Sequence, residues 1–256
     1  MRILLTNDDG ILAPGLTALA AAVREMGPLS IVAPDSPQSA AGRSLTLHGP
    51  VLCRKVEVDG THWGIGVAGR PVDCVKLAFR ELLRGQVDLV LAGINAGANV
   101  GVNIFYSGTV AAAAEGALLG VPAVAFSLAG RGQMDYDRAA RYCRWVLDGL
   151  LAGGLARGQL VNVNVPPLTP EGPRGVRFVP MSTAAITESY TRADHDSGGW
   201  LFTLNEYYEH GPQESETDVA ALAEGFITVT PLHSDLTDHK QLAQMDKAPW
   251  PDLPRE

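Results

Sequence analysis

Residues 1–10 read MRILLTNDDG, and this stretch decides both the fold class and the position of the candidate site. The apolar run predicts a buried strand over Ile3–Thr6. Asp8 and Asp9 follow at once, and adjacent carboxylates raise one another's pKa unless a cation neutralises them. Successive strand residues point to opposite faces, so both can reach one ion only in a turn, which Gly10 favours. We therefore expect a cation-binding turn at this strand end.

Beyond this stretch, apolar strand-like runs alternate with amphipathic helical patterns. We expect strands at Leu29–Ala33, Val87–Ala92, Ala123–Ser127 and Leu160–Val165, and helices at Pro14–Met26, Pro71–Leu83, Thr109–Gly120 and Tyr136–Leu151. Asp59-Gly60 predicts a tight hairpin between two further strands, Val51–Val58 and Thr61–Ile65. Strands that are apolar on both faces and alternate with helices predict an α/β fold, with a parallel sheet covered on both sides.

The pattern changes after residue 170. Short strand-like runs between 174 and 210 predict a β-rich arm, which could pack on a neighbouring subunit or fold back on its own core. A helix and a strand within 215–240 are expected to return to the core, and 247–256 to form a loose tail. We expect a single domain over 1–256, with its α/β core at about 1–170.

Composition argues against several classes of protein. The formal net charge is -8 and no run is rich in Lys or Arg, so we expect no nucleic-acid partner. No apolar run reaches the roughly 18 residues of a membrane span, so no membrane association is expected. The three cysteines are widely spaced, without a CxxC pair, which favours reduced thiols and a cytoplasmic location.

The predicted carboxyl ends of the strands gather polar side chains. In open α/β sheets ligands bind at that edge. Asp8 and Asp9 follow the first strand, Ser39 follows the second, and Asn95 and Asn99 follow the strand "VDLVLA". Carboxylate, hydroxyl and amide oxygens suit Mg²⁺, Mn²⁺ or Ca²⁺ better than Zn²⁺. The alternative is that either aspartate only caps a turn.

A second feature is the segment Ser107-Gly108-Thr109, which precedes a small-residue helix. Free N–H groups and the positive end of the helix dipole favour an anion there, and Gly108 would let a phosphate approach the backbone. The alternative is an ordinary helix cap made by Ser107. No GxxxxGK[ST] or GxGxxG pattern follows the first strand, which argues against a P-loop protein and a nicotinamide oxidoreductase.

Four ordered blocks, "ILLTNDDG", "PQSAAGRSLTL", "AGINAGANVG" with "YSGTVAAAAEG", and "TDVAALAEGFITVTPL", resemble the signature blocks of the SurE family over residues 1 to about 238. The resemblance implies a Rossmann-like three-layer fold with a β-hairpin arm and a homodimer or homotetramer. It implies one divalent metal ion per subunit, Mg²⁺ or Mn²⁺, on Asp8, Asp9, Ser39 and Asn95. It also places substrate phosphate near Asn99, Ser107, Gly108 and Thr109.

The family's activity is metal-dependent hydrolysis of nucleoside 5′- and 3′-monophosphates, and in some members of polyphosphate. The resemblance therefore implies a 5′-nucleotidase in which Asp8 and Asp9 orient or deprotonate the attacking water. An aspartyl-phosphate mechanism and a non-catalytic nucleotide sensor remain as alternatives. The chain departs from the family pattern at Ala40, where glycine is usual, and at Arg70, where threonine is usual.

Overall fold

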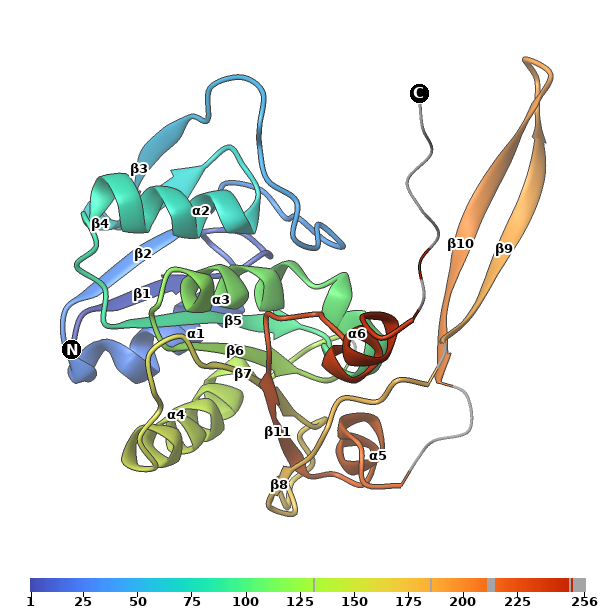
Figure 1. The fold of residues 1–256 in the computed structure, drawn as a ribbon. Helices are drawn as coiled ribbons and strands as arrows, with labels where there is room; N and C mark the ends of the chain where they lie inside the picture. The colour runs from blue at the N-terminus through green and yellow to red at the C-terminus, as the bar shows by residue number, and fades with distance from the viewer. Residues whose placement is uncertain (131, 185, 211–214, 249, 251–256) are drawn as a thin grey trace.

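The computed structural model describes residues 1–256 except 131, 185, 211–214, 249 and 251–256. A nine-stranded sheet forms its centre, in the order β3-β4-β2-β1-β5-β6-β7-β11-β8 (Figure 1). The strands are β1 (Ile3–Thr6), β2 (Leu29–Pro34), β3 (Cys53–Val58), β4 (Thr61–Val67), β5 (Leu89–Ala96), β6 (Ala123–Leu128), β7 (Leu160–Val165), β8 (Val176–Phe178) and β11 (Ile227–Leu232). The strands from β4 to β7 are parallel, as the sequence pattern predicts.

Helices cover both faces of this sheet and make three layers (Figure 1). The helices α1 (Pro14–Val23) and α4 (Tyr136–Ala152) contact each other and share one core with one face of the sheet. The helices α2 (Pro71–Leu77) and α3 (Gly108–Leu118) lie on the other face. α2 continues as a π-helical turn over Ala78–Leu82. In α3, a Cβ on Gly116 would lie 2.7 Å from Val90 of β5, so glycine allows this close helix–sheet contact.

The two ends of the sheet depart from the parallel pattern. β3 and β4 form the expected antiparallel hairpin, and both turn residues, Asp59 (φ 50°) and Gly60 (φ 72°), adopt left-handed conformations. At the other end, β11 runs antiparallel to β7 and parallel to β8. Sequence analysis assigns residues 174–178 to the arm, but β8 instead forms the edge of the main sheet, because β11 offers it a backbone partner.

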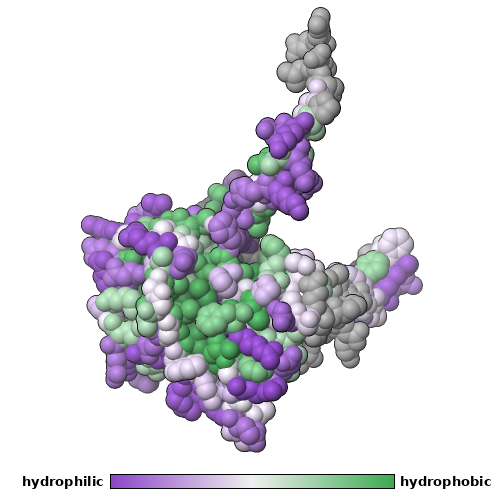
Figure 2. Space-filling view, turned by 60° about the horizontal axis from the view of Figure 1, so that its bottom comes forward, coloured by the Kyte–Doolittle hydropathy of each residue, from purple (hydrophilic) through white to green (hydrophobic). Residues whose placement is uncertain are grey.

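The arm is a separate two-stranded sheet, β9 (Ile186–His195) with β10 (Gly199–His210). It extends away from the core rather than folding back on it (Figure 1). Tyr190, Trp200 and Phe202 are exposed along it, and the Arg192 guanidinium lies 4.7 Å from the Trp200 ring centroid. Figure 2 shows two extensions leaving a core whose surface on this side carries hydrophobic residues surrounded by hydrophilic ones.

Two further helices follow the arm. The helix α5 (Asp218–Ala223) packs beside β11, and α6 (His239–Met245) is exposed. Of the expected tail at 247–256, position 249 and positions 251–256 lie outside the described residues. Within the part of the chain that the structure describes, no helix has the length and apolarity needed to cross a membrane.

Candidate metal and phosphate site

The turn that carries the two aspartates is built by the residues on either side of them. Asn7 Nδ2 donates to the Gly10 carbonyl (2.9 Å), and the Gly10 N–H donates to Asn7 Oδ1 (3.2 Å). Gly10 has a φ of 107°, a conformation that side chains disfavour. β1 ends at Thr6, so Asp8 and Asp9 lie in this turn and not on opposite faces of a strand. This arrangement confirms the predicted turn.

Asp8 lies against the amino end of α3. Its Oδ1 accepts a hydrogen bond from the Thr109 hydroxyl, and a Cβ on Gly108 would lie 2.8 Å from Asp8 Oδ2. Asp8 is 6% exposed. Its pKa is raised to about 6, chiefly by burial; the nearby charge of Asp9 contributes to the rise, and the Thr109 hydrogen bond works in the opposite direction. A buried carboxylate with a raised pKa is a group whose charged form a cation would stabilise.

Asp9 joins the turn to the carboxyl end of β5. Its Oδ2 accepts a hydrogen bond from the Ala96 N–H (3.0 Å), and burial raises its pKa. Asn95, one residue earlier on β5, donates from Nδ2 to the Gly97 carbonyl (2.8 Å). With its nitrogen held in this way, Asn95 retains Oδ1 as a potential ligand. Two strands that are neighbours in the sheet thus bring together three of the four predicted metal ligands.

The fourth predicted ligand, Ser39, lies on an exposed loop after β2. That loop is tied to the turn, because the Gln38 N–H donates to the Asp8 carbonyl (2.8 Å). Ala40 follows with a φ of 53°, a left-handed conformation that glycine adopts freely. Arg70 Nη1 donates to Gln38 Oε1 (2.5 Å), which places a guanidinium at the rim of the site. Sequence reasoning noted Arg70 only as a departure from the family pattern.

The predicted phosphate-binding residues occupy two positions. Ser107 Oγ accepts a hydrogen bond from the Val110 N–H (3.1 Å), so it is the N-cap of α3, while Gly108 and Thr109 contact Asp8. Asn99 is buried after the end of β5. Its Nδ2 donates to Ser127 Oγ (2.8 Å), and its own N–H donates to Asn164 Oδ1 (2.8 Å). Its contact with substrate stays a prediction.

The donor set fits a hard divalent cation. Two carboxylates, an amide and a hydroxyl offer oxygen, the atom that Mg²⁺ and Mn²⁺ prefer. Across the described residues, no group of three or more His, Cys, Asp or Glu side chains is placed to hold a metal ion. The site therefore combines a carboxylate pair with neutral oxygens, and the amino end of α3 lies against Asp8.

A cavity of about 760 Å³ lies between the amino ends of α1 and α4. It is lined by Leu12, Pro14, Thr17, Ala18 and residues 133–137. A Cβ on Gly15 would lie 2.0 Å from the Ile94 carbonyl and 3.1 Å from Tyr136 Cε1, so Tyr136 lies close to the end of β5. Burial and the charge of Asp9 raise the Tyr136 pKa. Sequence reasoning missed this ring, which only tertiary packing brings to the site.

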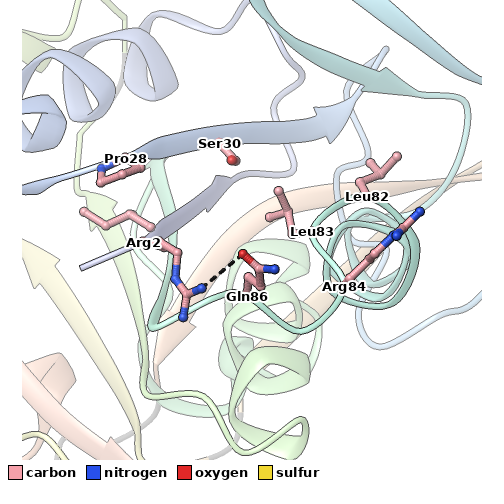
Figure 3. A pocket seen from close by; sticks show the side chains of 8 residues that line it. Arg2, Pro28, Ser30, Leu82, Leu83, Arg84 and Gln86 are labelled. Carbon is pink, nitrogen blue, oxygen red and sulfur yellow. Dashed lines mark hydrogen bonds between the residues drawn. The ribbon is translucent and has the colours of Figure 1, made fainter.

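A second cavity, of about 270 Å³, lies at the opposite edge of the sheet (Figure 3). Residues that precede or begin β1, β2 and β5 line it. Arg2 donates to Gln86 Oε1 (3.2 Å) there and pairs with Asp88 at 2.9 Å. Ligands of open α/β sheets bind at the carboxyl ends of the strands. By this rule we expect ligands at the carboxylate pair and not in this cavity.

Fold and site together define a class of protein: a three-layer α/β protein with a pair of buried carboxylates at the carboxyl ends of its parallel strands. A family model described as "Survival protein SurE" matches residues 3–188. A relative from Rhodopirellula baltica, named 5′-nucleotidase SurE, is 43% identical over 246 residues, which cover 96% of this chain and 97% of the relative. The crystal structure of the SurE protein from Aquifex aeolicus has a TM-score of 0.84 and 36% identity, covering 96% of this chain and 98% of that one. The chain belongs to the SurE family.

Proposed function

We propose that this protein is a metal-dependent 5′-nucleotidase, which hydrolyses nucleoside 5′-monophosphates to a nucleoside and phosphate. The observation that carries the proposal is the contact between Asp8 and the amino end of α3, through Gly108 and Thr109. It joins the groups that suit a cation to the groups that suit a phosphate. The relative named 5′-nucleotidase SurE, at 43% identity over nearly the whole chain, supports this activity.

The proposed cofactor is one divalent ion per subunit, Mg²⁺ or Mn²⁺, held by Asp8, Asp9, Ser39 and Asn95. Such an ion polarises a phosphoryl oxygen and lowers the pKa of bound water. The raised pKa of Asp8 supports this assignment, since among the described residues no cationic side chain forms a hydrogen bond with this buried carboxylate. The loop that carries Ser39 would place this residue near the ion, because the neighbouring Gln38 N–H donates to the Asp8 carbonyl.

The chain's own residues would then position phosphate and water. The amino end of α3 offers the Gly108 N–H and its positive dipole end to the equatorial phosphoryl oxygens, where charge develops during transfer. We assign the base to Asp9, because Asp8 is the more deeply buried and already accepts the Thr109 hydroxyl. Asp9 takes a proton from water as the water oxygen bonds to phosphorus. The bond from phosphorus to the ester oxygen breaks, and that oxygen leaves with a proton from solvent.

The substrate rim combines an aromatic cavity and a guanidinium. The cavity beside Tyr136, of about 760 Å³, offers room for a nucleoside next to Asp9. Arg70 places a positive charge near an otherwise acidic site, in a chain whose formal net charge is -8. We include nucleoside 3′-monophosphates and polyphosphate as further substrates of the proposed enzyme.

We also propose a single domain over 1–256, with an oligomeric assembly and a cytoplasmic location. Exposed aromatic residues along β9 and β10 support a homodimer or homotetramer, since an extended two-stranded arm has little apolar contact of its own. Cys53, Cys74 and Cys143 are free thiols, as expected in a reducing compartment.

Phosphate release tests the function directly. Purified protein is assayed with nucleoside 5′- and 3′-monophosphates and polyphosphate, with Mn²⁺, with Mg²⁺ and with EDTA, beside Asp8→Asn. We expect metal-dependent release that Asp8→Asn abolishes. Tight nucleotide binding without release under any metal would instead identify a sensor. Recovery of an acid-labile phosphoenzyme would replace direct water attack with an aspartyl-phosphate mechanism.

A further inference from the structure

The main chain that leaves β5 pairs with β6 as far as Gly97, whose N–H donates to the Leu128 carbonyl (2.9 Å). From there the chain runs through residues 97–100 into the 3₁₀ helix Gly101–Phe105. This helix holds Ser107, because the Ser107 N–H donates to the Asn103 carbonyl (3.2 Å). A shift of Gly101 would therefore move the N-cap of α3. This connecting segment, residues 97–101, needs external anchors to hold it.

One anchor is the side chain of Asn164 on β7. Its Oδ1 accepts from the Asn99 N–H (2.8 Å), and its Nδ2 donates to the Asn99 carbonyl (3.1 Å). A single buried amide thus binds both backbone groups of one residue, as a neighbouring strand would. Asn162 Nδ2 also donates to the Asn99 carbonyl (2.8 Å). Both asparagines are fully buried, so these bonds do not compete with solvent.

The other anchor is Asp218, the first residue of α5. Its Oδ2 accepts from the Gly101 N–H (2.9 Å). Its Oδ1 accepts from the Ser182 N–H (2.9 Å) in the segment that leads to the arm, and from its own neighbour Val219 (2.8 Å). Asp218 is fully buried, and bonds to a buried carboxylate are stronger than neutral ones. Val100 also packs against Val219, so α5 holds the segment by apolar contact as well.

We propose that Asp218 and Asn164 are positioning residues for the nucleotidase reaction. They fix residues 97–101 and so set the separation between Asn95, on the cation side, and Ser107–Thr109, on the phosphate side. Asp218 binds the site segment and the chain that leads to the arm through different oxygens of one carboxylate. The catalytic part of this inference rests on the proposed function, whereas the anchoring part does not.

The variant Asp218→Asn is directed at the bond from the Gly101 N–H. The amide oxygen can keep the Oδ1 position, where two N–H groups donate, while the NH₂ group then faces the Gly101 N–H and cannot accept from it. Thr217→Ala is the matched control, because it removes the N-cap bond from the Ala220 N–H (3.4 Å) at the same end of α5 and leaves Gly101 untouched. Both variants lower the stability of α5, but only the first releases the segment.

Two readouts are measured on the full chain: exchange of the Gly101 amide proton with solvent, and kcat and KM for 5′-AMP with Mn²⁺. For Asp218→Asn we expect amide exchange to accelerate roughly tenfold or more, and kcat to fall about 10- to 100-fold. Thr217→Ala should change both by less than about twofold. If Asp218→Asn does not fold, Asn164→Leu replaces it, since leucine is close in volume and removes both the acceptor for the Asn99 N–H and the donor to the Asn99 carbonyl, so the Asn99 amide should exchange faster.

Unchanged exchange and kcat in the Asp218 or Asn164 variants of an active enzyme would overturn the inference and leave the proposed function intact. Equal losses in Thr217→Ala would also overturn it, because general destabilisation would then explain them. If the wild-type protein releases no phosphate, the proposed function fails, and amide exchange alone decides whether Asp218 anchors the segment.

Discussion

Gly108 lies directly against Asp8. A Cβ at position 108 would come within 2.8 Å of both Asp8 Cβ and Asp8 Oδ2, closer than real side chains approach. Gly108→Ala should therefore push the carboxylate away from the amino end of α3, and we expect kcat/KM to fall about 100-fold or more. Steady-state phosphate release from 5′-AMP measures the effect.

Gly149→Ala is the matched control for that substitution. Gly149 lies within α4, and a Cβ there would meet nothing within 4 Å. Alanine should keep full activity and raise the free energy of unfolding by about 0.5–1 kcal/mol. Full activity in Gly108→Ala would show that this contact does not shape the site.

The raised pKa of Asp8 gives a pH-dependent stability in protein freed of metal with EDTA. Burial raises this pKa from 3.8 to about 6, so the folded state binds the proton more tightly than the unfolded chain. The contribution of Asp8 to stability is then greatest at acidic pH and falls as pH rises between these two values. Asp8→Asn removes this loss, and urea unfolding at pH 8 should show it more stable by about 1–3 kcal/mol.

Asp88 supplies the control of opposite sign. The Arg2 hydrogen bonds lower its pKa to about 2, so its contribution is present above the ordinary value near 4 and is lost as pH falls toward 2. Asp88→Asn should therefore lower stability at pH 8, in the opposite direction to Asp8→Asn. A metal-free Asp8→Asn protein that is less stable than wild type at pH 8 would contradict the assigned cost of the buried charge.

Arg70 should increase the affinity for anionic substrates. Its guanidinium is exposed at the rim and is held by Gln38 at 2.5 Å. Arg70→Gln should raise KM for 5′-AMP by about 3- to 10-fold, leave kcat nearly unchanged and flatten the dependence of kcat/KM on salt. Arg80→Gln removes an equal charge in the π-helical turn Ala78–Leu82. It should leave KM, kcat and the salt dependence of kcat/KM unaffected. An unchanged KM in Arg70→Gln would remove this residue from the substrate rim.

Substitution of Tyr136 should lower activity on nucleotides more than activity on small phosphate esters. If the nucleoside occupies the cavity beside this ring, Tyr136→Ala should lower kcat/KM for 5′-AMP about tenfold, since a base stacked on an aromatic ring contributes on the order of 1–3 kcal/mol. Glycerol phosphate, which lacks a base, should be affected less than about twofold. Tyr136→Phe keeps the ring and should retain most of the activity on 5′-AMP. Equal losses for both substrates would place the nucleoside elsewhere.

Local sequence signals predicted the central strands and the turn of the site. Continuous apolar runs predict β1, β5 and β6, and Asp59-Gly60 predicts its hairpin, because each signal lies within a few neighbouring residues. The carboxylate pair at the end of β1 was visible in the same way. These features depend on periodicity and turn chemistry, which the chain carries locally.

Long-range partners could not be predicted in this way. β8 has three residues, and it belongs to the main sheet only because β11 pairs with it. Asn99 and Asn164 are 65 positions apart, and Gly101 and Asp218 are 117 apart. In the sequence alone, a single polar residue such as Asn164 or Asp218 is equally compatible with a helix cap or a turn. Their role follows from the packing that brings them together.

The most direct test of the central claim is anomalous diffraction from crystals grown with Mn²⁺. We expect one anomalous peak per chain at the carboxyl edge, with oxygen atoms of Asp8, Asp9, Ser39 and Asn95 at about 2.0–2.4 Å. Beside that peak, the amino end of α3 should present the N–H groups of Gly108 and Thr109. A peak bound elsewhere, or no peak in protein that is active only with Mn²⁺, would contradict the assignment of this site.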